Sequence, residues 1–555
     1  MSRRPAGRIA VVGAGSAGAF FALELSRLRP GVPIDLYERG GAPPGAGIVL
    51  SWEFADRIKA DHPQVLDIPG SAMATWDRTL TVVDTERVWS GAYGMFGVSR
   101  EEFQRHARDL ASGLPNVTFR RRTVSGRPGE PGDHDLVVVA DGARSRTRAS
   151  REGEFGTRAF PGRTRFLWMS TPIALEPTFV LKPVSGGLLI VHSYPHGTDV
   201  STFIVEADIE VIAAQGLYDR PSPEVETLLA EIFKDELRGA PLRAQTGGWR
   251  AFSTITNERW HSGPLVLIGD AAHTVHFSTG SGTALAIDDA RCLARALAER
   301  SSAAEALAEY EAERRPVIQA AQAEADESRR WFETLSRRER VRGHQTVFAL
   351  RSRRAANTYG RLRARDPEFV DAAVRTLAGG PADGEPADLP IGLGGIRLTG
   401  RCAAVEDDGR GGPVLRLPAA DGYVPCPVLD AGGPPPDPVP RCALVAGDPD
   451  AGLGAFVRRL RSGGASAVGL LVPAAEPAKA KETTAAGCDF LAVPSLPGNG
   501  RGERTRAADE ARYECGLPVL LLSAEPFSRD EINTLILGGR IDLFAYVGGL
   551  KADIS

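Results

Sequence analysis

A glycine-rich turn near the start of the chain constrains the fold more than any other feature. It reads Gly13-Ala-Gly15-Ser16-Ala17-Gly18 and stands between a predicted short buried strand over 8–12 and a stretch with apolar residues at helical spacing. Gly13 permits a tight turn, Gly15 lets a pyrophosphate approach the backbone, and Gly18 lets the helix pack closely on the strand. A diphosphate would then lie at the positive end of the helix dipole. The turn therefore predicts a Rossmann-like α/β domain that binds a dinucleotide.

The second strand of this unit is predicted over 33–37, and it leads into Glu38 and Arg39. An acid about 20 residues past the last glycine accepts hydrogen bonds from the ribose hydroxyls of a dinucleotide. Glu38, and Arg39 next to it, are candidates for cofactor binding. The sequence shows no second fingerprint of this kind, so we expect NAD(P)H to have no Rossmann domain of its own.

A related element lies roughly 250 residues further along the chain. An apolar run over 265–268 leads into Gly269 and Asp270, and a glycine-bearing turn then opens an amphipathic helix. Two such elements, so far apart, are what a chain that wraps an extended FAD requires. The first would hold the ADP half, and the second would hold the ribityl chain and place backbone against the isoalloxazine ring. The candidate cofactor-binding residues of the second element are Gly269, Asp270, Gly280, Ser281, Gly282 and Thr283.

A third segment indicates the same cofactor. It is an apolar strand, 136–140, followed by Asp141 and Gly142, with Ser145 and Arg148 after them. With the two glycine turns, this DG-x-x-S-x-x-R segment resembles the single-component flavoprotein aromatic hydroxylases, the superfamily of p-hydroxybenzoate hydroxylase. In that family the Asp-Gly segment lies near both the FAD pyrophosphate and the path of the nicotinamide. Arg100 matches the arginine that meets the FAD phosphates in such enzymes.

The resemblance can be narrowed to one branch of that family. Period-two alternation predicts strands of a substrate-domain sheet over 165–169, 178–181, 189–194 and 201–206. Together with 257–261, 276–278 and 363–370, these strands resemble the branch of salicylyl-CoA 5-hydroxylase and anthraniloyl-CoA monooxygenase. Most hydroxylases have proline where this chain has Phe277. The resemblance covers residues 8 to about 375.

The resemblance also implies the chemistry. NAD(P)H reduces FAD, O₂ forms a flavin C4a-hydroperoxide, and that species hydroxylates an electron-rich aromatic ring. The expected substrate is an aryl-CoA thioester such as salicylyl-CoA or anthraniloyl-CoA. Two alternatives stay open. One is the same chemistry on a free or carrier-tethered aromatic or indole-derived substrate, and the other is a non-hydroxylating FAD-binding scaffold protein.

Three side chains are candidates for catalysis. His276 lies in the loop that should approach the isoalloxazine ring. His192 and Tyr194 stand two residues apart in a predicted strand of the substrate sheet, so they should share one face. His273 follows the Gly-Asp step, and the family resemblance implies that it supports the flavin fold.

The last third of the chain has a different resemblance. Segments 389–401, 515–522 and 530–542 are similar to the opening and the end of an old-yellow-enzyme barrel. Only about 170 residues are available, where a complete (β/α)₈ barrel needs roughly 250. The acid–base histidines and tyrosine of that family have no evident match. We therefore expect a partial, degenerate (β/α) barrel-like domain that does not close and binds no FMN.

These segments predict two modules. Residues 1–379 would form the FAD-dependent hydroxylase module, with FAD-binding segments at about 1–70, 95–150 and 255–300. The substrate sheet would be inserted at about 71–94 and 151–254, and helices would follow over 301–379. Residues 380–555 would form the module without flavin.

Composition excludes several other classes of protein. The 555 residues carry 66 Lys+Arg against 70 Asp+Glu, a net charge of −4, which gives no electrostatic case for nucleic acid or a membrane surface. No apolar run approaches the roughly 18 residues of a membrane span, and the start lacks the apolar core of a signal peptide, so we expect a cytoplasmic enzyme. The 6 cysteines show no C-x-x-C pairing, which indicates free thiols and no metal site. A homodimer is one possible assembly.

Overall fold

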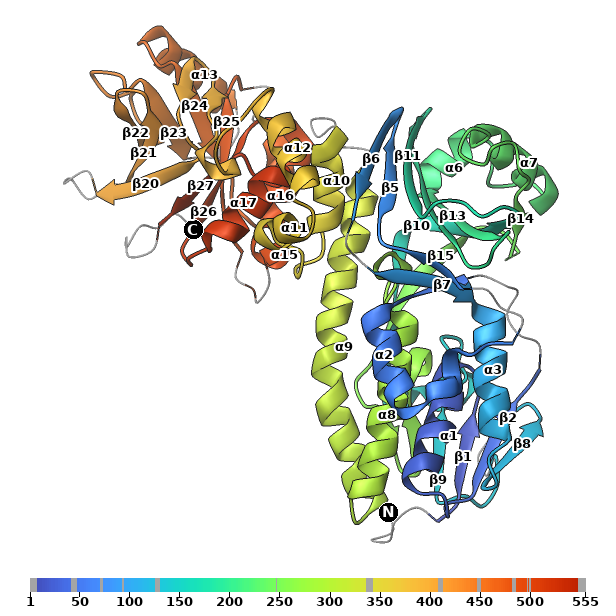
Figure 1. Cartoon of the computed structure of the whole chain (residues 1–555). Coiled ribbons are helices and arrows are strands. Elements are labelled where there is room, and N and C mark those ends of the chain that lie inside the picture. The colour runs from blue at the N-terminus through green and yellow to red at the C-terminus, as the bar shows by residue number, and fades with distance from the viewer. Residues whose placement is uncertain are drawn as a thin grey trace. The chain divides into compact units, whose positions relative to one another are not determined.

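The computed structural model divides the chain into two compact units (Figure 1). Unit 1 comprises Met1–Thr85 and Gly91–Glu333, and unit 2 comprises Glu86–Ser90 and Thr334–Ser555. The units therefore divide at residue 334, and helices 343–378 belong with the C-terminal unit, whereas the sequence suggested a boundary at 379. The residues described are 7–40, 47–69, 73–91, 94–124, 130–245, 247–335, 343–407, 413–446, 451–481, 486–496, 498 and 501–547.

The first sheet of unit 1 is Rossmann-like. Its order is β16 (His261–Ser262), β17 (Leu265–Leu267), β9 (Leu136–Val139), β1 (Ile9–Val12), β2 (Ile34–Glu38) and β8 (Val117–Arg121). All neighbouring pairs are parallel except β16–β17. The strands of the three predicted flavin segments, β17, β9 and β1, are therefore adjacent, and their carboxyl ends meet at one edge. This arrangement confirms the predicted FAD-type fold.

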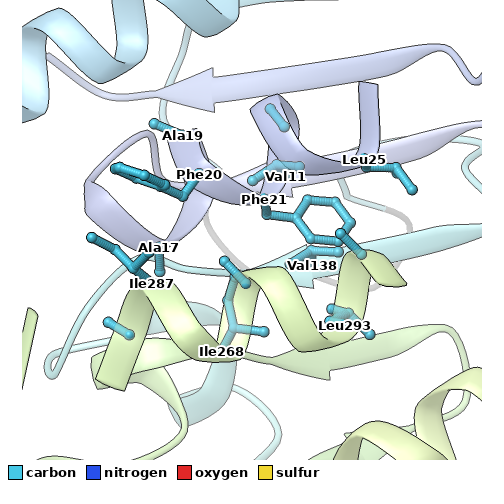
Figure 2. Packing of buried hydrophobic residues seen from close by; sticks show 14 of the residues in the cluster. Val11, Ala17, Ala19, Phe20, Phe21, Leu25, Val138, Ile268, Ile287 and Leu293 are labelled. Atoms are coloured by element: carbon cyan, nitrogen blue, oxygen red, sulfur yellow. The ribbon is translucent and has the colours of Figure 1, made fainter. Parts of the chain in front are cut away.

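Helices cover this sheet because their apolar stripes pack against its apolar strands, such as β1 and β9. Figure 2 shows Phe21 and Leu25 of α1 (Ser16–Leu28) packed near Leu293 of α8 (Gly282–Glu299), with Val138 of β9 in the same buried cluster. All of them are at most 1% exposed. The other helices of unit 1 are α2 (Trp52–Asp61), α3 (Arg100–Ser112), α4 (Arg146–Ala149), α5 (Glu152–Phe155), α6 (Ile209–Ala214), α7 (Ser222–Ile232) and α9 (Ala303–Thr334), with 3₁₀ turns η1 (Pro63–Leu66), η2 (Gly269–Ala271) and η3 (Phe277–Thr279).

The second large sheet of unit 1 is the predicted inserted substrate sheet. Its order is β14 (Arg243–Ala244), β10 (Thr157–Thr171), β13 (Ser201–Asp208), β12 (Gly187–Pro195), β11 (Thr178–Val184) and β5 (Thr79–Val83), with β15 (Arg250–Asn257) also paired to β10. Of these pairs, only β11–β5 is parallel. A smaller sheet joins β3 (Gly47–Ser51), β7 (Met95–Ser99) and β4 (Ala74–Trp76).

Unit 2 contains a closed barrel. Its strands are β20 (Cys402–Asp407), β21 (Pro413–Ala419), β22 (Gly422–Asp430), β23 (Cys442–Ala446), β24 (Ala467–Leu471), β25 (Phe490–Pro494), β26 (Val519–Ser523) and β27 (Leu543–Tyr546). Its other elements are β6 (Glu86–Ser90), α10 (Gly343–Ser352), α11 (Tyr359–Arg365), α12 (Pro367–Ala378), η5 (Pro386–Asp388), the hairpin β18 (Ile391–Leu393) and β19 (Ile396–Leu398), α13 (Ala451–Ser462), η6 (Pro477–Lys479), α15 (Arg501–Arg504), α16 (Arg506–Cys515) and α17 (Arg529–Leu537).

The prediction that this barrel is partial and does not close is wrong. Strand β20 pairs in parallel with β27, with Cys402 opposite Phe544, and this pairing completes the ring. Closure needs less chain than eight βα units because β20, β21 and β22 are consecutive antiparallel neighbours that need no connecting helix. Apolar side chains of the strands form one buried cluster with those of the β18–β19 hairpin.

Two further observations concern the whole described chain. Its 6 cysteines are all free thiols. Within the described ranges, no helix has the length and apolar character that a membrane crossing demands.

Candidate active site

The glycines of the first turn are required by close packing. A Cβ atom on Gly13 would overlap the carbonyl of Ala140 at the end of β9, and φ of Gly13 is +102°. A Cβ atom on Gly18 would overlap the carbonyl of Gly13. The turn therefore brings the start of α1 directly against the carboxyl ends of β1 and β9.

The N-terminus of α1 has the features of a diphosphate site. Its N-cap residue is Gly15, and no side chain caps the first turn. Ser16 and Ala17 are buried there, and Gln104 of α3 donates to Ser16 Oγ over 3.3 Å. Uncapped N–H groups at a helix N-terminus are suited to an anion.

Glu38 is fixed at the end of β2 beside this turn. Its Oε2 accepts a hydrogen bond from Ala14 N at 3.0 Å, and its Oε1 accepts one from Gly40 N at 3.2 Å. The carboxylate is thus held beside the fingerprint, where the sequence predicted a ribose contact. Arg39 is exposed, and the structure gives it no contact within the described residues.

The Asp-Gly segment is tied to the other flavin segments. Asp141 Oδ2 accepts from Arg146 N at 3.1 Å, whereas Asp141 Oδ1 is buried and has no partner among the described residues. Burial raises the pKa of Asp141. Gly142 has a φ of +86°. Arg148 donates to Ala271 O over 2.8 Å and so links this segment to the Gly-Asp turn. An uncapped helix, an orphaned carboxylate oxygen and the glycine packing together fit a bound FAD.

A buried ion pair holds the Gly-Asp turn. Asp289 of α8 is 0% exposed and accepts from Gly269 N at 3.1 Å, from His273 Nε2 at 2.6 Å and from Arg314 Nε at 2.8 Å. Burial alone would raise the pKa of Asp289, but the charges of His273 and Arg314 lower it. His273 is thus linked to the backbone of the Gly-Asp turn through Asp289. Sequence reasoning did not single out Asp289 or Arg314. The helical spacing of Asp289 after the turn was a signal for Asp289, and Arg314 had none.

The turn itself leaves Asp270 accessible. The side chain of Asp270 reaches solvent, but desolvation by the surrounding protein raises the pKa of its carboxyl group, and the charge of Arg100 opposes this shift. Gly269 and Gly280 both have positive φ values, +58° and +64°. No side chain caps α8, whose N-cap is Ser281, and Gly282 and Thr283 form its half-buried first turn. The second predicted cofactor element is thus a second uncapped helix N-terminus.

Arg100 lies between the flavin segments and the substrate sheet. It is the first residue of α3, one turn before Gln104, and its guanidinium lies 5.5 Å from the centre of the Trp168 ring. Desolvation raises the pKa of Asp270 and of Tyr194, and the positive charge of Arg100 lowers both. Because Arg100 forms no ion pair within the described residues, it is available to a ligand anion.

One face of the substrate sheet is lined with rings. Phe277 of the flavin loop lies at its centre, with ring-centre distances of 5.1 Å to Phe166, 6.1 Å to Trp168 and 5.4 Å to His192. Phe252 and His276 also contact it. The indole Nε1 of Trp168 is buried and has no partner among the described residues. This face suits a flat aromatic ligand.

The structure brings together two of the three candidate catalytic residues. His192 and His276 both approach the buried carboxylate of Glu206, at 3.0 Å and 3.8 Å. Tyr194 lies on the same strand as His192, but its hydroxyl donates to Gly47 O over 2.8 Å. Burial raises the pKa of Tyr194 to about 12, so its hydroxyl is neutral near pH 7. Sequence reasoning missed Glu206, whose signal was an acid directly after the apolar residues 203–205.

The chain matches known proteins in both units. Residues 83–325 match the family model described as FAD binding domain. A salicyloyl-CoA 5-hydroxylase of a Streptomyces species is 32% identical over 98% of this chain and 100% of its own length. A 3-hydroxy-4-methyl-anthranilyl-[aryl-carrier protein] 5-monooxygenase of Streptosporangium sibiricum is 37% identical over 59% of this chain and 90% of its own. A protodeoxyviolaceinate monooxygenase of Chromobacterium violaceum is 31% identical over 62% of this chain and 94% of its own.

Fold, site and relatives define an FAD-binding monooxygenase that hydroxylates aromatic rings. The chain belongs to the flavoprotein aromatic hydroxylases, the superfamily of p-hydroxybenzoate hydroxylase. FAD supplies the oxygen-transfer chemistry in such an enzyme, and the protein binds and orients the ring and keeps water away from it.

Proposed function

We propose that this enzyme hydroxylates an aromatic ring carried as a CoA thioester, such as salicylyl-CoA or anthraniloyl-CoA, with NAD(P)H and O₂. The observation that supports this substrate is the extent of one match. The salicyloyl-CoA 5-hydroxylase aligns over 98% of this chain, so the likeness includes the barrel unit as well as the flavin unit. The relative named for a carrier-bound ring aligns over only 59%.

The proposed roles follow the geometry. The uncapped start of α1 and Glu38 would bind the ADP half of FAD, and Arg100 would meet its phosphates. Asp270 and the start of α8 would bind the ribityl chain and the flavin ring. The ring-lined face around Phe277 would hold the substrate. NAD(P)H would reach the flavin without a Rossmann domain of its own, so we expect substrate binding to accelerate flavin reduction.

Stopped-flow reduction of the bound flavin tests the substrate class. NADH and NADPH are each mixed with the full-length enzyme and with salicylate, anthranilate, their CoA thioesters or tryptophan. The proposal expects one of the thioesters to accelerate reduction, and the matching free acid to have little effect. Equal reduction rates with every compound would contradict it.

A carrier-bound ring is the second candidate. It is favoured by the higher identity, 37%, to the monooxygenase named for an aryl-carrier protein. The same assay separates the two when the aryl group is presented as a phosphopantetheine thioester on a purified carrier protein. Acceleration by the carrier-bound ring alone would favour this candidate over the CoA thioester.

A further inference from the structure

Arg250, the first residue of β15, stands beside the ring-lined face of the substrate sheet. Its side chain is half-buried and forms no hydrogen bond or ion pair among the residues that the structure describes. In the antiparallel pairing of β10 with β15, Arg250 lies directly opposite Phe166. Directly opposite residues of antiparallel strands project from the same face, with Cβ atoms about 4.5–5.5 Å apart. The Arg250 side chain therefore leaves the sheet on the same face as the Phe166 ring.

The ring-lined face is accessible from solvent beside Arg250. Phe166, Trp168, Phe252 and Phe277 are all half-buried, so each keeps part of its surface accessible. Phe277 contacts the other three, with ring-centre distances of 5.1 Å to Phe166, 6.1 Å to Trp168 and 6.0 Å to Phe252. Rings that contact one another and remain partly accessible offer a flat ligand a surface on which to stack. A ligand on Phe277 would thus have the Arg250 guanidinium within reach of its edge.

Within the described residues, no carboxylate of this face is paired with Arg250. Glu206 of β13 also stands opposite Phe166, but on the other side of β10, and its Oε2 pairs with His192 Nε2 at 3.0 Å. The other titratable or charged side chains that neighbouring elements present are Tyr194, His276 and Arg100, together with Asp326, Arg329 and Glu333 of α9, which pair with one another. Because a guanidinium stays protonated at neutral pH, a bound anion is the natural partner of Arg250.

The chemistry of a guanidinium restricts what that partner is. A guanidinium donates hydrogen bonds and accepts none, so its partner must present acceptor atoms. Its planar fork binds two neighbouring oxygen atoms at once. A 2-hydroxyaryl thioester offers such a pair, because its ring oxygen and its carbonyl oxygen lie side by side once the hydroxyl group has lost its proton. A 2-aminoaryl thioester presents N–H donors in place of the ring oxygen, so a donor would face a donor.

We infer that Arg250 is a specificity-determining residue that binds the ionised ring oxygen and the carbonyl oxygen of a 2-hydroxyaryl thioester. This inference rests on the proposed function and narrows it to the hydroxy-substituted thioester in preference to the amino-substituted one.

Binding in this form releases one proton. The O–H bond of the ring hydroxyl breaks, the electron pair stays on the oxygen, and the proton passes to water, which reaches the half-buried guanidinium. Nothing is oxidised or reduced in this step. The negative charge of the oxygen is balanced by Arg250, and its electron pair enriches the ring that is to be hydroxylated.

Ligand binding to the oxidised, FAD-loaded, full-length enzyme tests the inference. The CoA thioesters of 2-hydroxybenzoate and 2-aminobenzoate are titrated separately, and the change in flavin absorbance gives each Kd. We expect Arg250→Gln to raise the Kd of the hydroxy thioester by roughly 10–100-fold, because charge-assisted hydrogen bonds to its oxygen atoms are lost. The Kd of the amino thioester should change by less than about threefold.

The absorbance of the bound ligand gives a readout that a merely structural role would not move. The positive charge of Arg250 favours the ionised ring oxygen, so the phenolate band of the hydroxy thioester should form at a lower pH on the wild-type enzyme than in solution. Arg250→Gln should raise the midpoint of this band by about one pH unit or more. Arg250→Lys keeps the charge but not the planar fork, so it should restore more of the midpoint than of the affinity.

Arg158→Gln is the matched control. Arg158 belongs to the same sheet, on β10, but its side chain is 67% exposed and pairs with Glu258. The control should leave both Kd values and the phenolate midpoint unchanged. The FAD content of each variant is measured first, and if Arg250→Gln fails to fold, the loss of affinity of Arg250→Lys for the hydroxy thioester decides the question.

The outcomes distinguish this inference from the function on which it rests. An unchanged Kd of the hydroxy thioester in the Arg250 variants, or an equal rise in Kd for both thioesters, would overturn the inference and leave the thioester proposal standing. If neither thioester binds to the wild-type enzyme or accelerates flavin reduction, the proposed function fails, and the inference fails with it.

Discussion

Asp289 Oδ2 lies 2.6 Å from His273 Nε2, so a buried carboxylate of α8 fixes the histidine that follows the Gly-Asp turn. The same carboxylate accepts from Gly269 N and from Arg314. The backbone position of the second flavin segment therefore depends on a buried ion pair.

The first prediction is that Asp289→Asn destabilises unit 1 by about 3–5 kcal/mol, because it leaves the Arg314 guanidinium buried without a counter-charge. Chemical denaturation followed by flavin fluorescence measures this change. Asp288→Asn is the matched control, because Asp288 is adjacent but its ion pair is a long one, 3.4 Å, with the exposed Arg57. Equal midpoints for the two variants would contradict the assignment.

The pH dependence of this contribution has a defined sign. The pKa of Asp289 is lower in the folded protein than its ordinary value of 3.8. Its stabilisation is therefore fully present above the unfolded pKa and is lost as the pH falls through the lower folded value. Wild-type stability should fall more steeply below about pH 4 than that of Asp289→Asn. Parallel acid profiles for the two proteins would count against the ion pair.

A second prediction concerns the fingerprint. Gly18→Ala should abolish FAD binding or folding, because the new Cβ would overlap the carbonyl of Gly13 and separate α1 from β1. Gly31→Ala is the control, since nothing lies within 4 Å of a Cβ placed there. Flavin content per chain, from absorbance and total protein, measures the effect. A fully yellow Gly18→Ala protein would show that FAD binding does not depend on this close approach of α1 to the turn.

A third prediction concerns retention of FAD. Asp270→Ala and Glu38→Ala should each weaken FAD binding by roughly 1.5–3 kcal/mol through loss of a charge-assisted hydrogen bond. Glu231→Ala, at an exposed carboxylate of α7, is the control and should bind FAD as the wild type does. Equilibrium dialysis of apoprotein with FAD gives the dissociation constants. Full occupancy of Asp270→Ala under dilute conditions would refute its placement at the ribityl chain.

The sequence predicted the parts of the fold that local patterns determine. The apolar runs before the fingerprint, before Asp141 and before Gly269 became the adjacent parallel strands β1, β9 and β17. Period-two alternation correctly indicated the strands of the substrate sheet and placed His192 and Tyr194 on one strand. The predicted roles of the cofactor-binding and catalytic residues stay predictions.

The remaining features depend on contacts between distant segments. Glu206 meets His192 from the next strand and His276 from a loop 70 residues later, and no local pattern encodes that meeting. The partnership of Asp289 with Arg314 likewise joins two helices. The barrel prediction was wrong because a length estimate assumes a helix after every strand, whereas β20–β22 are antiparallel neighbours.

The last prediction is that the barrel unit carries no flavin and cannot be removed at the predicted boundary. Leu415, Leu444, Phe490 and Leu520 of the barrel strands are at most 2% exposed and belong to a single buried cluster. Because the acid–base histidines and tyrosine of the old-yellow-enzyme family have no evident match in the sequence, the intact protein should release one FAD per chain and no FMN when its flavin is extracted and separated by chromatography. FMN at a ratio near one would overturn this prediction.

Truncation after Gly379 should give insoluble or associated protein, because the cut passes through unit 2. It would separate α11 and α12 from α17: Tyr359 N donates to Thr534 Oγ1 over 2.8 Å, and Leu377 packs against the outer cluster of the barrel. Exposed apolar helix faces of this kind favour association. Size-exclusion chromatography with light scattering measures the outcome on chains ending at 379 and at 555. A soluble, monomeric 1–379 protein with full FAD content would contradict this prediction. It would show that the helices after 343 fold without the barrel, and that the division of the chain at 334 does not affect stability.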